Sequence, residues 1–413
     1  MRYRVSNVAE NVDISQAIIP DYKSKYSQTY QVKVITPIYG GGVKAGEPDR
    51  QMPIRASAIR GQLRYWWRFL AKNRDNNPLS GEALFEAERK IWGGMGDETE
   101  LNESEQDDFS SKVFIRVNAK SITEQQITNA TDTINRNNGI GYALFSAIQG
   151  GENHKLIKEG YTFQLSIFSD DLNDEDWQSV LLSIRWWACF GGIGARTRRG
   201  LGSVDIEDLT PLTHDDVKDY NNCELNEISA RDPIDAWNKA IGKLYLFRQG
   251  VGVGRDAGTG NRTGRSRWPE PDSIREITEK EGHPIKHDAR QSFPRAAFGL
   301  PIIFEIRGNG EPPKTELISN TSERLSSPLI LKAMRTKNGY KAIALKLPTG
   351  HVMSMSVILK KSGIGDDASL PKNFSSSKWW DTSKAKDVKP IINNEGTDAL
   401  TAFMNYFSKA EQS

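Results

Sequence analysis

The stretch of residues 181–204 constrains the fold most, because an apolar helical run leads there directly into a glycine-rich loop. Residues 191–203 hold five glycines and three arginines, and no acidic residue. Glycine allows backbone conformations with positive φ that expose N–H groups, and the planar guanidinium of arginine matches phosphate oxygens in pairs. The loop therefore predicts a binding site for a polyanion.

Two familiar nucleotide-binding loops do not fit this sequence. The P-loop requires a lysine followed by serine or threonine, but residues 200–203 read Gly-Leu-Gly-Ser. The dinucleotide fingerprint opens a helix, whereas this loop follows a helical run and precedes the strand-like residues 203–206. A glycine-capped helix end followed by a plain surface turn remains the alternative to a polyanion site.

The length of 413 residues is too great for one ordinary core and predicts two domains of about 150 to 200 residues each. No apolar run approaches the roughly 20 residues that cross a bilayer, and residues 1–13 lack the core of a signal peptide. Cys189 and Cys223 are the only cysteines, so a disulfide framework or a thiolate metal site is not expected. We therefore expect a reduced, cytoplasmic protein with no membrane segment.

The formal net charge of +2 hides a marked segregation of charge along the chain. Residues 97–108 contain seven acidic residues and no basic one, whereas residues 55–72 contain five basic residues and no acidic one. Residues 250–268 add four arginines against a single acid. Local patches of one sign, rather than net charge, determine where a phosphate backbone can dock.

The first half of the chain predicts two helices, each between strands. Strand-like alternation covers residues 29–38, 112–118 and 161–168, and helical spacing of apolar residues covers residues 57–72 and 174–190. The two helices share an Arg-Trp-Trp-like sequence, and we expect at least one tryptophan of each pair to face the core. This order predicts a ferredoxin-like α+β domain over residues 1–210, with an insertion at about 73–110.

The second half predicts another α+β domain over residues 231–413, after a polar linker at 211–230. Asp232 suits the N-cap of a helix and Pro233 its first turn, and the helix should run to about residue 247. A second loop rich in glycine and arginine follows at residues 250–268. Further strands are predicted at 300–307, 329–334, 340–347 and 352–359. The strands at 329–334 and 340–347 should form a hairpin through residues 335–339, and the strand at 352–359 should extend their sheet. A closing helix is predicted at 397–408.

Five short motifs resemble those of the RAMP proteins of CRISPR systems. Among RAMP proteins, the combination resembles subunit one of the type III-B effector, the Cmr complex. The motifs are TPIYGGG, MPIRASAIRGQLRYWWR, GGIGARTRRGLGS, FPRAAFGLPIIF and RLSSPLILKA, and they lie in this order between residues 36 and 333. The resemblance implies two ferredoxin-like RAMP domains with long inserted loops. It also implies a place at one end of a ribonucleoprotein, beside other RAMP subunits, holding the 3′ region of a guide RNA or the target RNA paired with it.

The RNA contacts implied by the resemblance fall in two motifs. Carried onto this chain, they are Arg55, Ser57, Arg60, Arg64, Gly194, Arg196, Arg198 and Arg199. Basic residues of neighbouring loops extend the predicted contact set to Lys44, Arg50, Arg255 and Arg262. Arginines and backbone N–H groups hold phosphates without reading bases, which suits a subunit that must accept any guide. We expect Arg60 and Arg198 to converge on one groove.

Catalysis is the competing hypothesis, because some RAMP relatives cleave RNA. His283 and His287, with Asp288 beside them, could bind a metal or transfer protons, although Pro284 disrupts a helical pair of ligands. Asp49, after the first strand, is the other candidate. An endoribonuclease, dependent on a metal or not, is therefore the alternative. We predict no catalytic residue, no metal ligand and no cofactor.

Overall fold

The computed structural model describes residues 23–94, 110–135, 139–260, 262–280, 282–322, 324–362, 374–376 and 378–409. Within them the fold is α+β, as expected, with helices packed on antiparallel sheets. Residues 1–22 and the acidic run at 97–108 lie outside the described residues. None of the described helices is long and apolar enough to cross a membrane.

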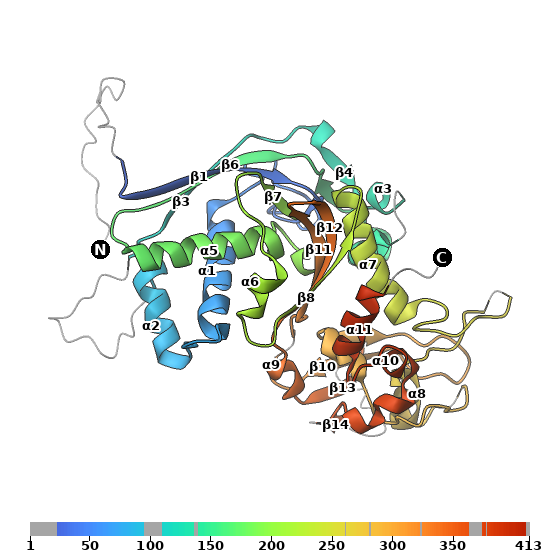
Figure 1. Cartoon of the computed structure of the whole chain (residues 1–413). Helices are drawn as coiled ribbons and strands as arrows, with labels where there is room; N and C mark the ends of the chain where they lie inside the picture. Colours follow the sequence, from blue (N-terminus) through green and yellow to red (C-terminus); the bar gives the residue numbers. More distant parts are fainter. Residues whose placement is uncertain are drawn as a thin grey trace, which may run out of the picture.

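The first sheet has four antiparallel strands in the order β3-β6-β1-β7. Its strands are β1 (Tyr26–Val34), β3 (Phe114–Ala119), β6 (Thr162–Ser169) and β7 (Val204–Ile206). Helix α1 (Ala56–Asn73) follows β1, and α5 (Asp174–Phe190) connects β6 to β7. Both helices lie on one side of the sheet (Figure 1). The β-α-β-β-α-β order is the one predicted for a ferredoxin-like domain.

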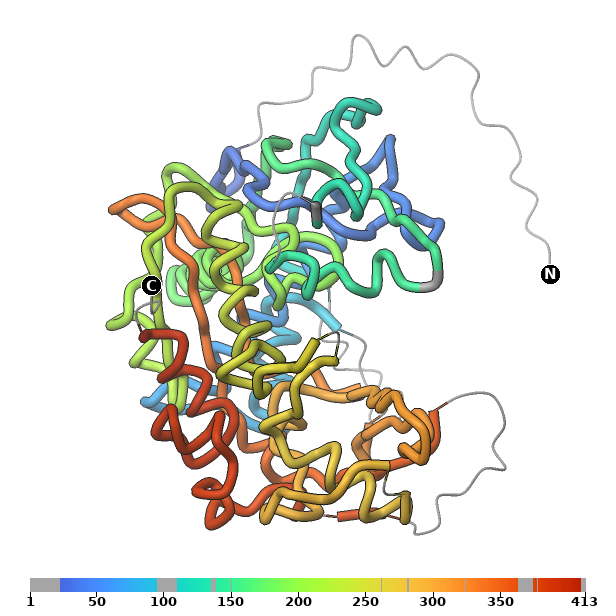
Figure 2. Tube along the Cα trace, turned by 90° about the vertical axis from the view of Figure 1, so that its right-hand side faces the viewer, coloured from blue at the N-terminus to red at the C-terminus, as the bar shows by residue number. Residues whose placement is uncertain are grey.

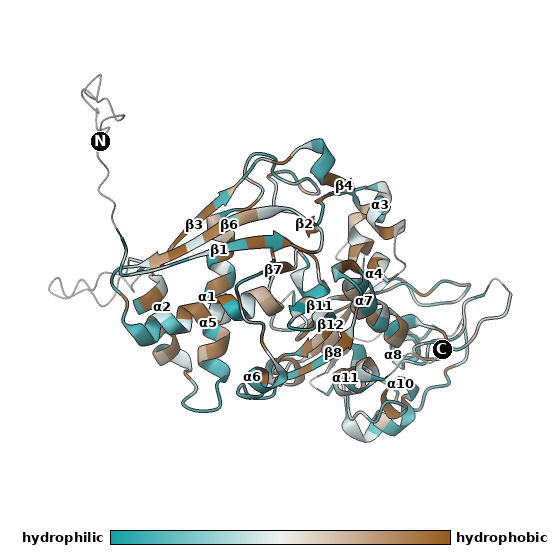
Figure 3. Cartoon of the chain, turned by 45° about the horizontal axis from the view of Figure 1, so that its top comes forward, coloured by the Kyte–Doolittle hydropathy of each residue, from teal (hydrophilic) through white to brown (hydrophobic). Residues whose placement is uncertain are grey.

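Alternation along the strands gives this sheet one buried and one exposed face. Tyr30, Val32 and Val34 are buried, while Gln31 and Lys33 between them are exposed. Figure 3 shows the corresponding change between hydrophobic and hydrophilic colour along β1 and β3. Such alternation is typical of an antiparallel sheet with one solvated side.

The two tryptophan pairs lie between the helices. Trp66 and Trp67 of α1 and Trp186 and Trp187 of α5 are all buried, and the rings of Trp66 and Trp186 lie 5.6 Å apart. The prediction of a core position is therefore confirmed for both members of each pair.

Inserted segments surround this first sheet. Helix α2 (Gly81–Trp92) lies within the predicted insertion and packs on α1. A small sheet has the strand order β2-β5-β4, and two short helices are close to it in sequence. These elements are β2 (Ile38–Tyr39), β4 (Ile127–Asn129), β5 (Lys155–Ile157), α3 (Ala130–Asn135) and α4 (Ile140–Leu144).

The second large sheet has three strands among the described residues, in the order β11-β12-β8. They are β8 (Glu224–Ser229), β11 (Leu329–Thr336) and β12 (Gly339–Lys346), with helices α7 (Pro233–Gln249) and α11 (Ala399–Ser408). The predicted hairpin of β11 and β12 is confirmed. Part of the predicted linker is instead α6 (His214–Lys218) and β8, which pairs with β12. The elements β8, α7, β11, β12 and α11 form a second β-α-β-β-α unit. Within the described residues, its sheet has no fourth strand.

Strand β11 is buried on both faces, and its residues enter two cores alternately. Leu331 and Ala333 belong to the core under α7, while Ile330 and Met334 belong to the core around α1 and α5. Helices α1 and α5 therefore lie between the two sheets (Figure 1). The two halves of the chain share a buried interface and are not joined by a linker alone.

A separate lobe follows from insertions in the second half (Figure 2). Its sheet has the order β14-β13-β10-β9, from β9 (Ile302–Phe304), β10 (Thr315–Ser319), β13 (Val357–Lys361) and β14 (Phe374–Ser376). The prediction that residues 352–359 extend the sheet of β11 is wrong, because β13 pairs with β10 and β14. Short helices complete the lobe: α8 (Glu270–Thr278), α9 (Gly350–Met353) and α10 (Lys389–Ile392).

Candidate nucleic-acid interface

The glycine-rich loop after α5 packs tightly on the segment between β1 and β2. Thr36 Oγ1 donates to the Gly200 carbonyl at 2.6 Å and accepts from the Ser203 N–H at 2.8 Å. The Ala195 N–H donates to the Tyr39 carbonyl at 2.7 Å. Several loop N–H groups are thus already bonded within the protein, and the loop does not form an open cradle for phosphates.

The glycines of this loop allow the close packing. Gly202 has φ +62°, and a Cβ there would lie 1.9 Å from the Ile193 carbonyl oxygen. Gly194, predicted as an RNA contact, has φ +83° and would place a Cβ 2.5 Å from the Tyr39 carbonyl oxygen. Both positions require glycine for backbone conformation and for space.

The three arginines that follow lie at the 3₁₀ helix η5 (Thr197–Arg199), and each has a different environment. Arg196 Nη1 donates to the Ala143 carbonyl at 3.0 Å. Arg198 Nη2 donates to the Tyr65 hydroxyl at 3.0 Å, and Nη1 donates to the Ser327 carbonyl. Arg199 Nη1 donates to the Leu329 carbonyl at 2.9 Å. None of these partners is a carboxylate, so the positive charges are not neutralised.

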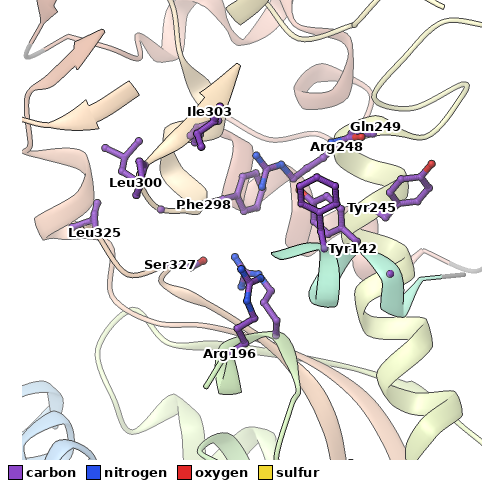
Figure 4. Close-up of a pocket in the computed structure, with 16 residues that line it drawn as sticks. Tyr142, Arg196, Tyr245, Arg248, Gln249, Phe298, Leu300, Ile303, Leu325 and Ser327 are labelled. Carbon is purple, nitrogen blue, oxygen red and sulfur yellow. The ribbon is translucent and has the colours of Figure 1, made fainter. Parts of the chain in front are cut away.

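Arg196 and Arg199 line a cavity of about 800 Å³ between the first domain and the C-terminal lobe. Its walls come from the segment at α4, from η5, from the end of α7 and from residues 298–303. A third arginine, Arg248 of α7, lies on the opposite wall, and Figure 4 shows Arg196 and Arg248 directed into the same space. Among the residues that the structure describes, no acidic side chain lines this cavity, which we call the acid-free cavity.

Arg248 forms no salt bridge or hydrogen bond within the described residues, and its Nε is buried; the carboxylate of Glu270, which acts on it electrostatically, is paired with Arg295 at 3.1 Å. The guanidinium carbon lies 5.9 Å from the ring centre of Tyr142 and 5.5 Å from that of Phe298. Cation–π contact holds the side chain in place without neutralising its charge. The sequence analysis did not identify Arg248. The only local signal is its position at the end of a helix, just before the second glycine- and arginine-rich loop.

Burial lowers the pKa of Arg199 to about 10 and also lowers the pKa values of Arg196 and Arg248. All three guanidinium groups remain protonated at neutral pH. Partly desolvated positive charges without carboxylate partners are unfavourable unless an anion compensates them. The lining of the cavity is therefore chemically suited to a negatively charged ligand.

Aromatic rings form the rest of the wall. Phe145 is 60% exposed and Tyr245 is 42% exposed, and the rings of Tyr142 and Tyr245 lie 6.0 Å apart. Together with Phe298 they give flat apolar surfaces next to the three positive charges. Such a combination of cations and aromatic faces is typical of sites for nucleotides and single-stranded nucleic acids.

A second cavity of about 850 Å³ adjoins the first and shares Phe145, Gln249 and Ile303 with it. Arg255, a predicted contact, lines it, and its guanidinium Nη1 donates to the Gly264 carbonyl at 3.1 Å. Figure 2 shows the two segments that bound these cavities, residues 139–151 in teal and residues 298–307 in orange.

The predicted contacts of the first motif lie elsewhere. Arg60 donates to the Val113 carbonyl at 3.3 Å and to the Trp92 carbonyl, and it lines a cavity of about 350 Å³ with Ser57. Arg198 instead donates to the hydroxyl of Tyr65. The Tyr65 side chain leaves α1 about 140° around the helix axis from the side chain of Arg60. The expected convergence of Arg60 and Arg198 on one groove is therefore not observed.

The remaining predicted contacts mostly have acidic partners. Arg64 pairs with Glu88 at 2.7 Å, Arg55 with Asp49 at 2.9 Å, Lys44 with Glu47 at 3.1 Å, and Arg50 with Glu124. Arg262 is exposed in the second glycine- and arginine-rich loop. These ion pairs compete with a phosphate, which distinguishes the residues from the arginines of the acid-free cavity.

The candidate catalytic residues Asp49, His283 and His287 each have different partners. Asp49 accepts from Met52 N at 3.0 Å and from Arg55, and the bond from Met52 contributes most to lowering its pKa. His283 Nδ1 bonds to Glu311, and His287 Nε2 lies 3.1 Å from the Ser266 carbonyl oxygen. The described residues contain no group of three His, Cys, Asp or Glu side chains that could hold a metal ion.

Comparison with known proteins gives a family for the first half. The model of the RAMP superfamily matches residues 31–205. No curated protein matches the sequence. One similar solved structure is the apo crystal structure of Cmr1 from Pyrococcus furiosus, with 17% identity, 86% of this chain and 95% of that chain covered, and a TM-score of 0.44.

A second similar structure is a chain of the type III-B Cmr-beta complex bound to cognate target RNA, determined by cryo-EM. It has 12% identity, covers 81% of this chain and 96% of that chain, and gives a TM-score of 0.41. The segment 31–205, which matches the RAMP superfamily, runs from β1 to β7 and so contains the strands of the first sheet.

Proposed function

We propose that this chain is a non-catalytic RNA-binding subunit of a type III-B CRISPR effector ribonucleoprotein in the cytoplasm. It holds the 3′ region of the guide RNA, or the target RNA paired with it, at one end of the complex beside other Cmr subunits. The match of residues 31–205 to the RAMP superfamily and the five sequence motifs support this assignment. The observation that carries it is the acid-free cavity lined by Arg196, Arg199 and Arg248.

The chemistry of the cavity suits binding without sequence preference. Guanidinium groups bind phosphate oxygens, which are the same in every nucleotide, and the aromatic rings accept any base. The protein can therefore hold guides of different sequence, while base pairing with the target supplies specificity.

The test is a binding titration of the purified chain with two unrelated, unstructured RNAs at increasing salt concentration. We expect similar affinities for the two sequences and a linear fall of log affinity with log salt, of about 0.7 for each phosphate contact. Affinity that is insensitive to salt, or restricted to one sequence, would contradict the proposal.

The alternative of an endoribonuclease is favoured by one observation. His283 is exposed, and its Nδ1 is bonded to Glu311, a carboxylate that Arg275 holds at 2.8 Å in the interior. A carboxylate that orients an imidazole in this way is a common feature of general bases. Our proposal predicts no cleavage of RNA with or without Mg²⁺, whereas cleavage abolished by His283→Ala or Asp49→Ala would establish the alternative.

A further inference from the structure

The two adjoining cavities meet at a junction formed by Phe145, Gln249 and Ile303, the residues that line both. Phe145 is 60% exposed and Ile303 is 54% exposed. The ring of Phe145 stacks on no other ring in the described part of the chain. Two large apolar side chains thus lie uncovered where the acid-free cavity meets a cavity lined by both arginines and acidic residues, and their exposure to solvent has a cost in free energy.

Uncompensated positive charge lies on both sides of this junction. One cavity carries Arg199 and Arg248, neither of which has a carboxylate partner. The other carries Arg255, whose guanidinium donates to the Gly264 carbonyl. The acidic residues of this second cavity are already paired: Asp272 with Arg265 and Arg275 at 2.7 Å, Glu311 with Arg275 at 2.8 Å, and Glu305 with Arg307 at 3.0 Å. The order along the groove is therefore cation, apolar surface, cation.

We infer that the junction binds one unpaired nucleobase of single-stranded RNA against Phe145 and Ile303, with the adjacent phosphates in the two cavities. This inference rests on the proposed RNA-binding function and specifies its substrate. In a strand, each base is flanked by two phosphates, so the charge order of the groove matches the order of groups in the ligand.

Double-stranded RNA does not fit the same chemistry. Within a duplex the base faces are covered by neighbouring base pairs, and proteins reach mainly phosphates and 2′-hydroxyls across the minor groove. An exposed phenylalanine can stack only on a base whose face is free. Each cavity also lies within the range of roughly 300–1,000 Å³ that is typical of sites enclosing small ligands.

The test compares Phe145→Ala with wild type by fluorescence anisotropy of a labelled ten-nucleotide oligouridylate. Loss of one stacked base should weaken binding about tenfold. Phe145→Trp should restore most of the affinity. The matched control is Phe85→Ala, because Phe85 is 51% exposed on α2 and lies outside both cavities. Melting curves of all three variants should overlap with that of the wild type.

Two further ligands separate this inference from RNA binding in general. An abasic oligonucleotide of the same length should bind wild type and Phe145→Ala equally, and a blunt RNA duplex should bind wild type more weakly than the single strand. Unchanged affinity of Phe145→Ala for oligouridylate, with reduced affinity of Arg248→Ala, would overturn the base site but leave the RNA-binding function standing. If neither variant binds oligouridylate more weakly than wild type, both the base site and the proposed interface are wrong.

Discussion

Arg248 lies against the ring of Phe298, with its guanidinium carbon 5.5 Å from the ring centre and its Nε without a hydrogen-bond partner. Helix α7 and the segment before β9 therefore hold a positive charge at the cavity wall without neutralising it. We therefore expect Arg248 to contribute to ligand binding more than to folding.

Arg248→Ala should accordingly weaken RNA binding while leaving the melting temperature nearly unchanged. A charge-assisted contact contributes about 1.5–3 kcal/mol, so we expect a loss of affinity of roughly tenfold or more. The slope of log affinity against log salt should fall by about 0.7. Arg231→Ala, at an exposed position on the surface, is the control and should change neither quantity. An unaltered salt slope in Arg248→Ala would show that this residue contacts no phosphate.

Arg198→Ala should behave differently, because Arg198 connects distant parts of the fold. Its guanidinium donates to the Tyr65 hydroxyl of α1 and to the Ser327 carbonyl before β11. Removing it leaves these groups without their donor, at a cost of about 1–3 kcal/mol in the free energy of unfolding. Chemical denaturation measures this change. A variant as stable as the wild type would mean that Arg198 is available for RNA instead.

Gly202→Ala should strongly destabilise the protein. The new Cβ would lie 1.9 Å from the Ile193 carbonyl oxygen, at a φ of +62° that alanine rarely adopts. Gly242→Ala provides the contrast, since that position lies within α7 and a Cβ there meets nothing within 4 Å. It should increase stability by about 0.5–1 kcal/mol. Thermal melting of both variants tests the pair, and equal effects would contradict the packing described for the loop.

From the buried Lys332 we predict that the free energy of unfolding depends on pH. Its Nζ is buried and donates to the Gly191 carbonyl at 2.6 Å, and burial lowers its pKa from 10.5 to about 7. Between these values the unfolded chain binds a proton that the folded chain does not, so this group makes stability rise with pH. The contribution approaches about 1.4 kcal/mol per pH unit. The variant Lys332→Met should lack this pH-dependent contribution. The free energy of unfolding of the variant, relative to that of the wild type, should therefore fall from pH 7 to pH 9.5. Parallel curves for the two proteins would refute the prediction.

Much of the first domain could be predicted from local sequence. The helices at 57–72 and 174–190 have strong helical spacing, and they correspond to α1 and α5 within a residue or so. The alternation of polar and apolar residues correctly predicted the strands β1, β3 and β6. The predicted cap of α7 is also present, since Asp232 accepts a hydrogen bond from Asp235 N at 2.8 Å. Local periodicity determines such elements because each buries one face of its own.

The site itself could be predicted only in part. Arg196 and Arg199 belong to the loop that the sequence singled out, and both line the cavity. Arg248 and Phe145 could not be assigned, since the cavity joins segments more than one hundred residues apart and no local pattern reports that contact. In the sequence, Arg60 and Arg64 stand in an acid-free basic stretch, as the arginines of the loop do. The sequence could not show that Arg60 is bonded to backbone carbonyls and Arg64 to Glu88.

The most direct test of the RNA interface is photo-crosslinking of 4-thiouridine-labelled RNA to the protein in the assembled particle, followed by identification of the attached peptides. We predict crosslinks to residues 141–145, 196–199 or 245–249, which bound the acid-free cavity. Crosslinks confined to residues 55–64 of α1, with none in these three segments, would contradict the account.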